Sequence, residues 1–217
     1  MKTLALFDLD GTLTDPKKGI TKSVAYALQH FSIEVSDLDE LTKFIGPPLR
    51  DSFREFYGFS EDEAEEAISK YREYFSEKGI YENALYPGTL EMLENFKSRN
   101  ITMVIATSKP TVYAKIIAKH FKFIQYFDFI AGAELDGTRS NKSEVIDYAL
   151  KSIGCTQKKD AIIMIGDRSH DIIGAKEMGI DSIGVTWGYG SKEELEKAGA
   201  TWIVDSMEEL CSVVLGL

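Results

Sequence analysis

Five short apolar runs constrain the fold more than any other feature of this sequence. They are TLALFD (3–8), ITMVIAT (101–107), FDFIAG (127–132), AIIMIG (161–166) and DSIGVT (181–186). Each run is apolar almost throughout and does not alternate with polar residues, which is typical of strands buried on both faces. Stretches with helical periodicity precede the second run, at 88–98, and separate the later runs, at 111–121, 142–151 and 169–178. The sequence therefore predicts an α/β fold with a doubly wound parallel sheet.

The chain between the first two runs is about 90 residues long, far more than one crossover helix requires. Within it, residues 20–31, 48–56 and 61–77 show helical periodicity, and no strand-like run occurs. We therefore expect a helical domain inserted at 16–82. Residues 1–15 and 83–217 would form the α/β core.

The charge and the cysteine content restrict the partners and the compartment. The formal net charge is −10, which argues against nucleic acid and anionic membranes as partners. The two cysteines form neither a metal-ligand pattern nor a disulfide framework, which favours a reducing compartment. No apolar run approaches the roughly 20 residues of a membrane span, and the apolar start is too short for a signal peptide. We expect a cytoplasmic protein, and the sequence leaves open whether it is a monomer or a homodimer.

Polar residues follow the predicted strands or begin the next helix at four places. They are Asp8 and Asp10, Thr107 and Ser108, Lys142, and Asp167 with Asp171. Asn141 and Glu144 also predict a capping box at the start of the helix that carries Lys142. Ligands of open parallel sheets bind at the carboxyl ends of the strands. We therefore expect these polar side chains to share one pocket.

Four aspartates in one pocket would repel one another strongly. Raised pKa values, partial exposure or a bound cation would relieve that repulsion. Carboxylate oxygens without a suitably spaced His or Cys favour Mg²⁺ over zinc. We expect Asp8 and Asp167 to bind the ion directly, and Asp171 to bind it through water.

The other polar residues have the chemistry of an anion site. Thr107, Ser108 and the free amides of the following helix would donate hydrogen bonds to an anion. Lys142 would supply a positive charge. Together with an acidic metal site, these donors predict phosphoryl transfer.

The ordered motifs resemble those of a known superfamily. Asp8-x-Asp10-Gly11-Thr12-Leu13, Thr107-Ser108, Lys142 and Gly166-Asp167-x-x-x-Asp171 resemble, in order, the four motifs of the haloacid dehalogenase-like superfamily. The resemblance covers the whole core and implies a Rossmann-like fold. The inserted helices are similar to that superfamily's all-helical cap domain. Within the superfamily, the chain most resembles the phosphoglycolate phosphatase-like branch, which includes small-metabolite phosphatases and 5′-nucleotidases.

The resemblance implies a role for each residue of the first motif. Asp8 would be the nucleophile that forms an aspartyl-phosphate. Asp10 would protonate the leaving oxygen and later activate water, and its backbone carbonyl would join Asp8 in binding Mg²⁺. The implied function is a Mg²⁺-dependent phosphatase of a small phosphorylated metabolite, either a phosphoglycolate-like acid or a nucleoside 5′-monophosphate. In the cap, Arg50 is a candidate to bind the substrate, although a solvated position is the alternative.

Other functions fit parts of the same pattern. A sugar phosphomutase would use both aspartates, and the motifs do not separate it from a phosphatase. A non-catalytic phospho-aspartate receiver or binding protein would also have an acidic Mg²⁺ pocket. Asp10 and the helical insertion disfavour a receiver, which needs neither a leaving-group acid nor a lid. Lys109 is a rival to Lys142 as the phosphate-binding lysine.

Overall fold

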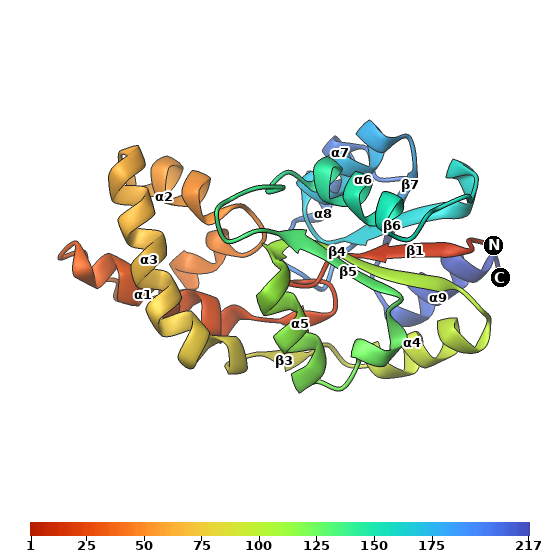
Figure 1. The fold of residues 1–217 in the computed structure, drawn as a ribbon, viewed down its shortest axis with the longest axis horizontal. Coiled ribbons are helices and arrows are strands. Elements are labelled where there is room, and N and C mark those ends of the chain that lie inside the picture. The colour runs from red at the N-terminus through yellow and green to blue at the C-terminus, as the bar shows by residue number, and fades with distance from the viewer. The chain divides into compact units, whose positions relative to one another are not determined.

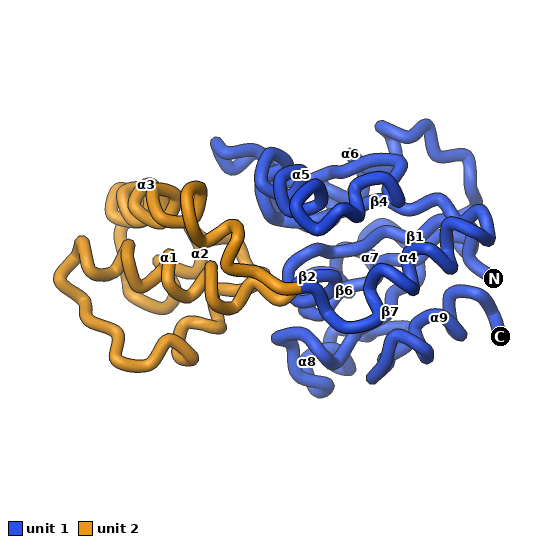
Figure 2. Tube along the Cα trace, turned by 90° about the horizontal axis from the view of Figure 1, so that it is seen from below, with its two compact units in different colours: residues 1–14, 85–217 blue, residues 15–84 orange.

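A computed structural model describes residues 1–217 (Figure 1). The chain forms two compact units, Met1–Thr14 with Leu85–Leu217 and Asp15–Ala84 (Figure 2). These boundaries lie within two residues of those expected from the sequence, 16–82 for the insertion. The chain leaves the first unit at β2 (Thr14–Asp15) and returns at β3 (Ala84–Leu85), and these two segments pair as a small sheet. The use of the second unit as a cap stays a prediction.

The first unit is built on a six-stranded sheet in the order β5-β4-β1-β6-β7-β8. Its strands are β1 (Leu4–Phe7), β4 (Thr102–Pro110), β5 (Phe129–Ala133), β6 (Ile162–Gly166), β7 (Asp181–Val185) and β8 (Trp202–Val204). All neighbouring strands pair in parallel. The predicted doubly wound α/β fold is confirmed, and the short edge strand β8 is the one core strand that the apolar runs do not predict.

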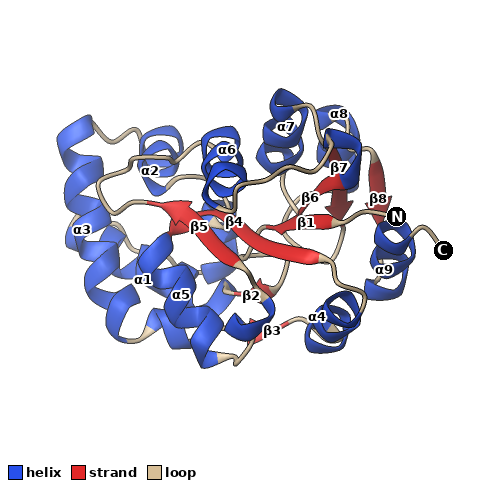
Figure 3. Ribbon diagram, turned by 45° about the vertical axis from the view of Figure 1, so that its right-hand side comes forward, coloured by secondary structure: helices blue, strands red, loops and turns tan.

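Helices cover both faces of this sheet (Figures 1 and 3). One face carries α6 (Lys142–Ser152), α7 (Ser169–Met178) and α8 (Lys192–Ala198); the other carries α4 (Thr89–Ser98), α5 (Thr111–His120) and α9 (Met207–Leu215). Leu6 of β1 belongs to the same buried cluster as Val145 of α6. The next residue, Phe7, lies on the opposite face, with its ring 6.3 Å from that of Phe96 on α4. Because both faces are covered, successive positions of a central strand must be apolar.

The second unit is helical, as its periodicity predicts. It contains α1 (Lys17–His30), α2 (Leu49–Tyr57), α3 (Glu61–Glu77) and the 3₁₀ segments η1 (Leu38–Phe44) and η2 (Gly79–Tyr81). Ser60 and Glu63 form a capping box that begins α3. Gly19 of α1 allows close approach of the returning chain, because a Cβ there would lie 2.0 Å from the Gly79 carbonyl oxygen. Short 3₁₀ segments also precede β5 (η3, Ile124–Tyr126) and β6 (η4, Lys159–Ala161).

None of these helices combines the length and the apolar character that crossing a membrane requires.

Candidate active site

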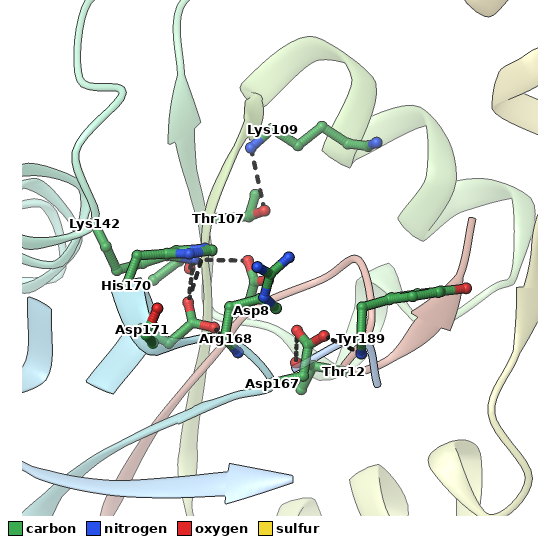
Figure 4. Close-up of polar contacts among 12 residues, drawn as sticks. Asp8, Thr12, Thr107, Lys109, Lys142, Asp167, Arg168, His170, Asp171 and Tyr189 are labelled. Carbon is green, nitrogen blue, oxygen red and sulfur yellow. Dashed lines mark hydrogen bonds and ion pairs between the residues drawn. The ribbon is translucent and has the colours of Figure 1, made fainter. Parts of the chain in front are cut away.

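Asp8, Lys142, Asp167 and Asp171 come together at the carboxyl edge of the sheet, and Thr107 lies on the neighbouring strand β4 (Figure 4). Asp8 directly follows β1, Asp167 directly follows β6, and Thr107 lies in β4. Since β1 lies between β4 and β6, three positions far apart in sequence become neighbours at the same edge. The backbone N–H of Asp8 donates to the carbonyl of Ile165 at 2.8 Å. This bond extends the pairing of β1 with β6 by one residue and fixes the backbone position of Asp8.

Lys142 connects three elements of the core. It is the first residue of α6, and its ammonium Nζ lies 2.8 Å from Asp8 Oδ1 and 2.7 Å from Asp171 Oδ1. The same group donates to the carbonyl of Ala106 in β4 at 3.1 Å. Burial alone would lower the pKa of Lys142, but the charges of Asp171 and Asp8 raise it above its usual value. Lys142 therefore remains a buried cation within the site.

Asp8, Asp167 and Asp171 form a buried acidic cluster. One carboxylate oxygen of each lies within 4.8 Å of the others. Burial raises the pKa of Asp8 to about 6, even though Lys142 opposes the rise. Burial, followed by the charges of Asp171 and Asp8, raises the pKa of Asp167 well above its usual range. The single positive charge of Lys142 does not neutralise three carboxylates. A divalent cation that binds oxygen ligands fits this set of donors.

The Asp167 carboxylate is packed against the turn of the first motif. Gly11 has a φ of +85°, and a Cβ at this position would lie 2.2 Å from Asp167 Oδ2. Glycine is therefore required for its backbone conformation and for the space that it leaves. The hydroxyl of Thr12 donates to Asp167 Oδ1 at 3.4 Å. The two acidic motifs consequently form one packed unit.

Asp10 has a cation of its own. Strand β1 ends at Phe7, so strand alternation does not set the side of the sheet on which Asp10 lies. Lys109 Nζ lies 2.5 Å from Asp10 Oδ2, and both side chains are nearly buried. Lys109, which the sequence left as a rival to Lys142, is therefore the partner of the second carboxylate.

The predicted anion donors lie at the end of β4, directly before α5. Thr107 is buried, and its hydroxyl accepts the backbone N–H of Lys109 at 3.3 Å. Ser108 is half-buried. The capping box predicted for α6 is wrong, because the Asn141 side chain makes no capping hydrogen bond. Lys142 instead anchors the first turn of this helix from inside the site.

Several residues of the site have no signal among the four motifs. The indole Nε1 of Trp187 donates to the carbonyl of Thr12 at 3.1 Å, and the backbone N–H of Tyr189 donates to Asp167 Oδ2 at 2.8 Å. Glu194 of α8 accepts the backbone N–H of Ser169 at 2.7 Å. The glycines in W-G-Y-G, directly after the last predicted strand, are the only sequence feature that marks this region.

Arg50 lies in the helical unit, on α2. Its guanidinium forms ion pairs with Glu61 and Glu65 of α3. These partners belong to the same unit, and about a third of the Arg50 side chain is exposed.

Comparison with known proteins agrees with the arrangement of these motifs. The family model described as haloacid dehalogenase-like hydrolase matches residues 5–185, and the chain belongs to this family. A 5′-nucleotidase of Pseudomonas aeruginosa is 50% identical over 190 residues, covering 88% of this chain and 85% of that protein. Tyrosine-protein kinase PtkA of Mycobacterium tuberculosis is 38% identical over 215 residues, covering 97% and 72%. The crystal structure of a predicted phosphatase from Clostridium acetobutylicum superimposes with a TM-score of 0.96 at 52% identity, covering both chains completely.

Proposed function

We propose that this protein is a Mg²⁺-dependent phosphomonoester hydrolase that acts on a small phosphorylated metabolite. The observation that carries the proposal is the buried contact of Lys142 with Asp8 and Asp171, beside Asp167. This cluster combines a carboxylate nucleophile, a fixed cation and oxygen ligands for a metal, which are the parts that phosphoryl transfer requires.

The reaction would have two steps. A carboxylate oxygen of Asp8 forms a bond to phosphorus while the bond to the leaving oxygen breaks, and Asp10 gives its proton to that oxygen. Asp10 then takes a proton from water, whose oxygen attacks phosphorus and releases Asp8 with inorganic phosphate. Lys142, Thr107 and Ser108 stabilise the negative oxygens of the transferred group.

The proposed metal ligands are Asp8, Asp167, Asp171 and the backbone carbonyl of Asp10. The cluster contains carboxylates and no sulfur or imidazole ligand, which favours Mg²⁺. The bound ion would supply positive charge to the phosphoryl group. Both carboxylate oxygens of Asp171 already have partners, Lys142 Nζ at Oδ1 and the backbone N–H of Arg168 at Oδ2, so its proposed contact with the ion is through water.

Mg²⁺ should stabilise the protein more strongly as the pH rises. The folded-state pKa of Asp8 is raised from 3.8 to about 6, so its contribution to stability is present below pH 3.8 and is lost as the pH rises to 6 and above. A cation relieves the repulsion between the ionised carboxylates. At Mg²⁺ concentrations of 100 times Kd we expect about 2.7 kcal/mol of stabilisation, a rise in Tm of about 5–10 °C. Calorimetry at pH 5 and pH 7.5, with and without Mg²⁺, measures the change.

Two comparisons isolate the metal in that experiment. NaCl at the same ionic strength controls for screening of surface charges. Burial lowers the pKa of His170 to about 4, which favours folding as the pH rises, and the metal-free sample at each pH measures this contribution. An equal Mg²⁺-induced rise in Tm at both pH values would contradict the proposed site.

We rank nucleoside 5′-monophosphates first as substrates and phosphoglycolate-like acids second, because the 5′-nucleotidase relative is 50% identical. A screen of phosphorylated metabolites for phosphate release tests the proposal, with EDTA as the control. We expect release in Mg²⁺ and none in EDTA. An isomerised sugar phosphate without release would indicate a phosphomutase. Transfer from ATP to tyrosine without release would indicate the activity for which PtkA is named.

Arg50→Ala is expected to change the rate ratios among the screened substrates by about tenfold, as loss of a hydrogen bond to a charged group would. The matched control is Arg54→Ala, on the same helix, because Arg54 also pairs with Glu61 (3.2 Å). Equal ratios in wild type and Arg50→Ala would remove Arg50 from substrate selection.

A further inference from the structure

We propose that residues 187–194, which comprise the loop after β7 and the first turn of α8, are a positioning segment of the metal site. This 187–194 segment would hold the Asp167 carboxylate and the first turn of α7, the helix that carries Asp171. The inference rests on the proposed function, because it takes Asp167 and Asp171 as metal ligands. It adds residues that none of the four motifs contains.

The first half of the segment surrounds Asp167, which is completely buried. The backbone N–H of Tyr189 donates to Asp167 Oδ2 at 2.8 Å. A Cβ on Gly188 would lie 2.3 Å from the Asp167 Cβ, and one on Gly190 would lie 2.0 Å from the Asp167 carbonyl oxygen. The W-G-Y-G sequence therefore allows the backbone to lie directly against the carboxylate, and a larger residue would displace it.

Trp187 connects this loop to the turn of the first motif. Its indole Nε1 donates to the Thr12 carbonyl at 3.1 Å, and the Thr12 hydroxyl donates to Asp167 at 3.4 Å. The position of Asp167 relative to the turn that follows Asp8 and Asp10 thus depends on the indole.

The other end of the segment holds α7. Glu194 accepts the backbone N–H of Ser169 at 2.7 Å and the Nε of Arg168 at 3.0 Å. Burial alone would raise the pKa of Glu194, but these hydrogen bonds lower it below its usual value. The backbone N–H of Arg168 in turn donates to Asp171 Oδ2 at 3.1 Å. Glu194 therefore fixes the turn between Asp167 and Asp171, and loss of such supporting contacts typically weakens metal binding 10- to 100-fold.

Mg²⁺ titration of the protein by isothermal calorimetry, without substrate, tests this role. We expect Glu194→Ala to raise the Kd for Mg²⁺ about tenfold or more. Glu194→Gln keeps an oxygen that can accept both N–H groups and should stay within about threefold of wild type. Glu196→Ala is the matched control, since Glu196 is an exposed glutamate of the same helix.

The outcomes separate this inference from the proposed function. Glu194→Ala with wild-type Mg²⁺ affinity would overturn the positioning role and leave the metal-dependent phosphatase standing. A wild-type protein that binds no Mg²⁺ would overturn both. A merely structural role for Glu194 would lower the Tm of the metal-free protein without changing the Kd measured well below that temperature, and this result also counts against positioning.

Intrinsic fluorescence gives a second, independent measurement, because Trp187 and Trp202 are the only tryptophans in the chain. We expect Mg²⁺ to change the emission of Trp202→Phe, which retains Trp187, and to leave that of Trp187→Phe unchanged. We also expect Trp187→Phe, which lacks the donor to Thr12, to bind Mg²⁺ several-fold more weakly. Emission of Trp187 that is insensitive to Mg²⁺ at saturation would contradict the link between the indole and the metal site.

Discussion

Asp8→Asn is expected to lower kcat for p-nitrophenyl phosphate in Mg²⁺ by about 10⁴-fold or more, since removal of a covalent nucleophile has effects of this order. An amide oxygen is a poor nucleophile and does not form an acyl phosphate. The measurement is release of nitrophenol by the purified variant and by wild type in parallel. Turnover within tenfold of wild type would exclude Asp8 as the nucleophile.

The metal-free Asp8→Asn variant should remain folded. Burial raises the pKa of Asp8 to about 6, so its ionised form is less favourable in the metal-free site than in water. A neutral amide removes that repulsion, although it weakens the ion pair with Lys142. Circular dichroism and the Tm of the variant therefore distinguish a lost nucleophile from a lost fold.

Asp10→Asn is the matched variant for the first motif. Nitrophenolate leaves readily without a proton, so the first step should still proceed, whereas water attack on the aspartyl-phosphate should be slow. We expect a phosphoenzyme that accumulates in Asp10→Asn, is sensitive to hydroxylamine, and is absent from Asp8→Asn. A phosphoenzyme that accumulates to the same level in Asp8→Asn would show that the phosphoryl group is bound to another residue.

Lys142→Met is expected to lower kcat by about 10²–10³-fold, the usual cost of removing one fixed donor from a developing anion. Methionine has a similar length and no charge, so the cluster of Asp8, Asp167 and Asp171 loses its internal cation. Removal of one partner from a buried ion pair typically costs about 3–5 kcal/mol of stability. We therefore expect a lower Tm without Mg²⁺ and a larger Mg²⁺-induced rise in Tm than in wild type.

Lys151→Met is the control for that variant. Lys151 lies on the same helix, α6, but its side chain is 75% exposed and pairs with Asp147 on the surface. Exposed ion pairs contribute little to stability, so its removal should leave the fold intact. We expect kcat to stay within about twofold of wild type. Equal activity in Lys142→Met and Lys151→Met would show that Lys142 has no role in phosphate transfer.

The fold was predictable because burial on both faces of the sheet leaves a local mark in the sequence. Leu6 and Phe7 contact opposite helix layers, and their apolar run reports this directly. The capping box at Ser60 and Glu63 was not predicted, although its two hydrogen bonds join residues only three positions apart. The capping box predicted at Asn141 and Glu144 is absent, and tertiary contacts of Lys142 hold the first turn of α6 instead.

By itself, the sequence determined the parallel sheet, the helical insertion and the strand ends at which the polar motifs lie. Only the tertiary structure decided which charges meet: Lys142 contacts Asp8 and Asp171, while Lys109 contacts Asp10. It also brought in Trp187 and Glu194, which no motif marks. The physical reason is that periodicity and capping reflect neighbours along the chain, whereas an ion pair between residues 134 positions apart depends on how β1 and α6 pack.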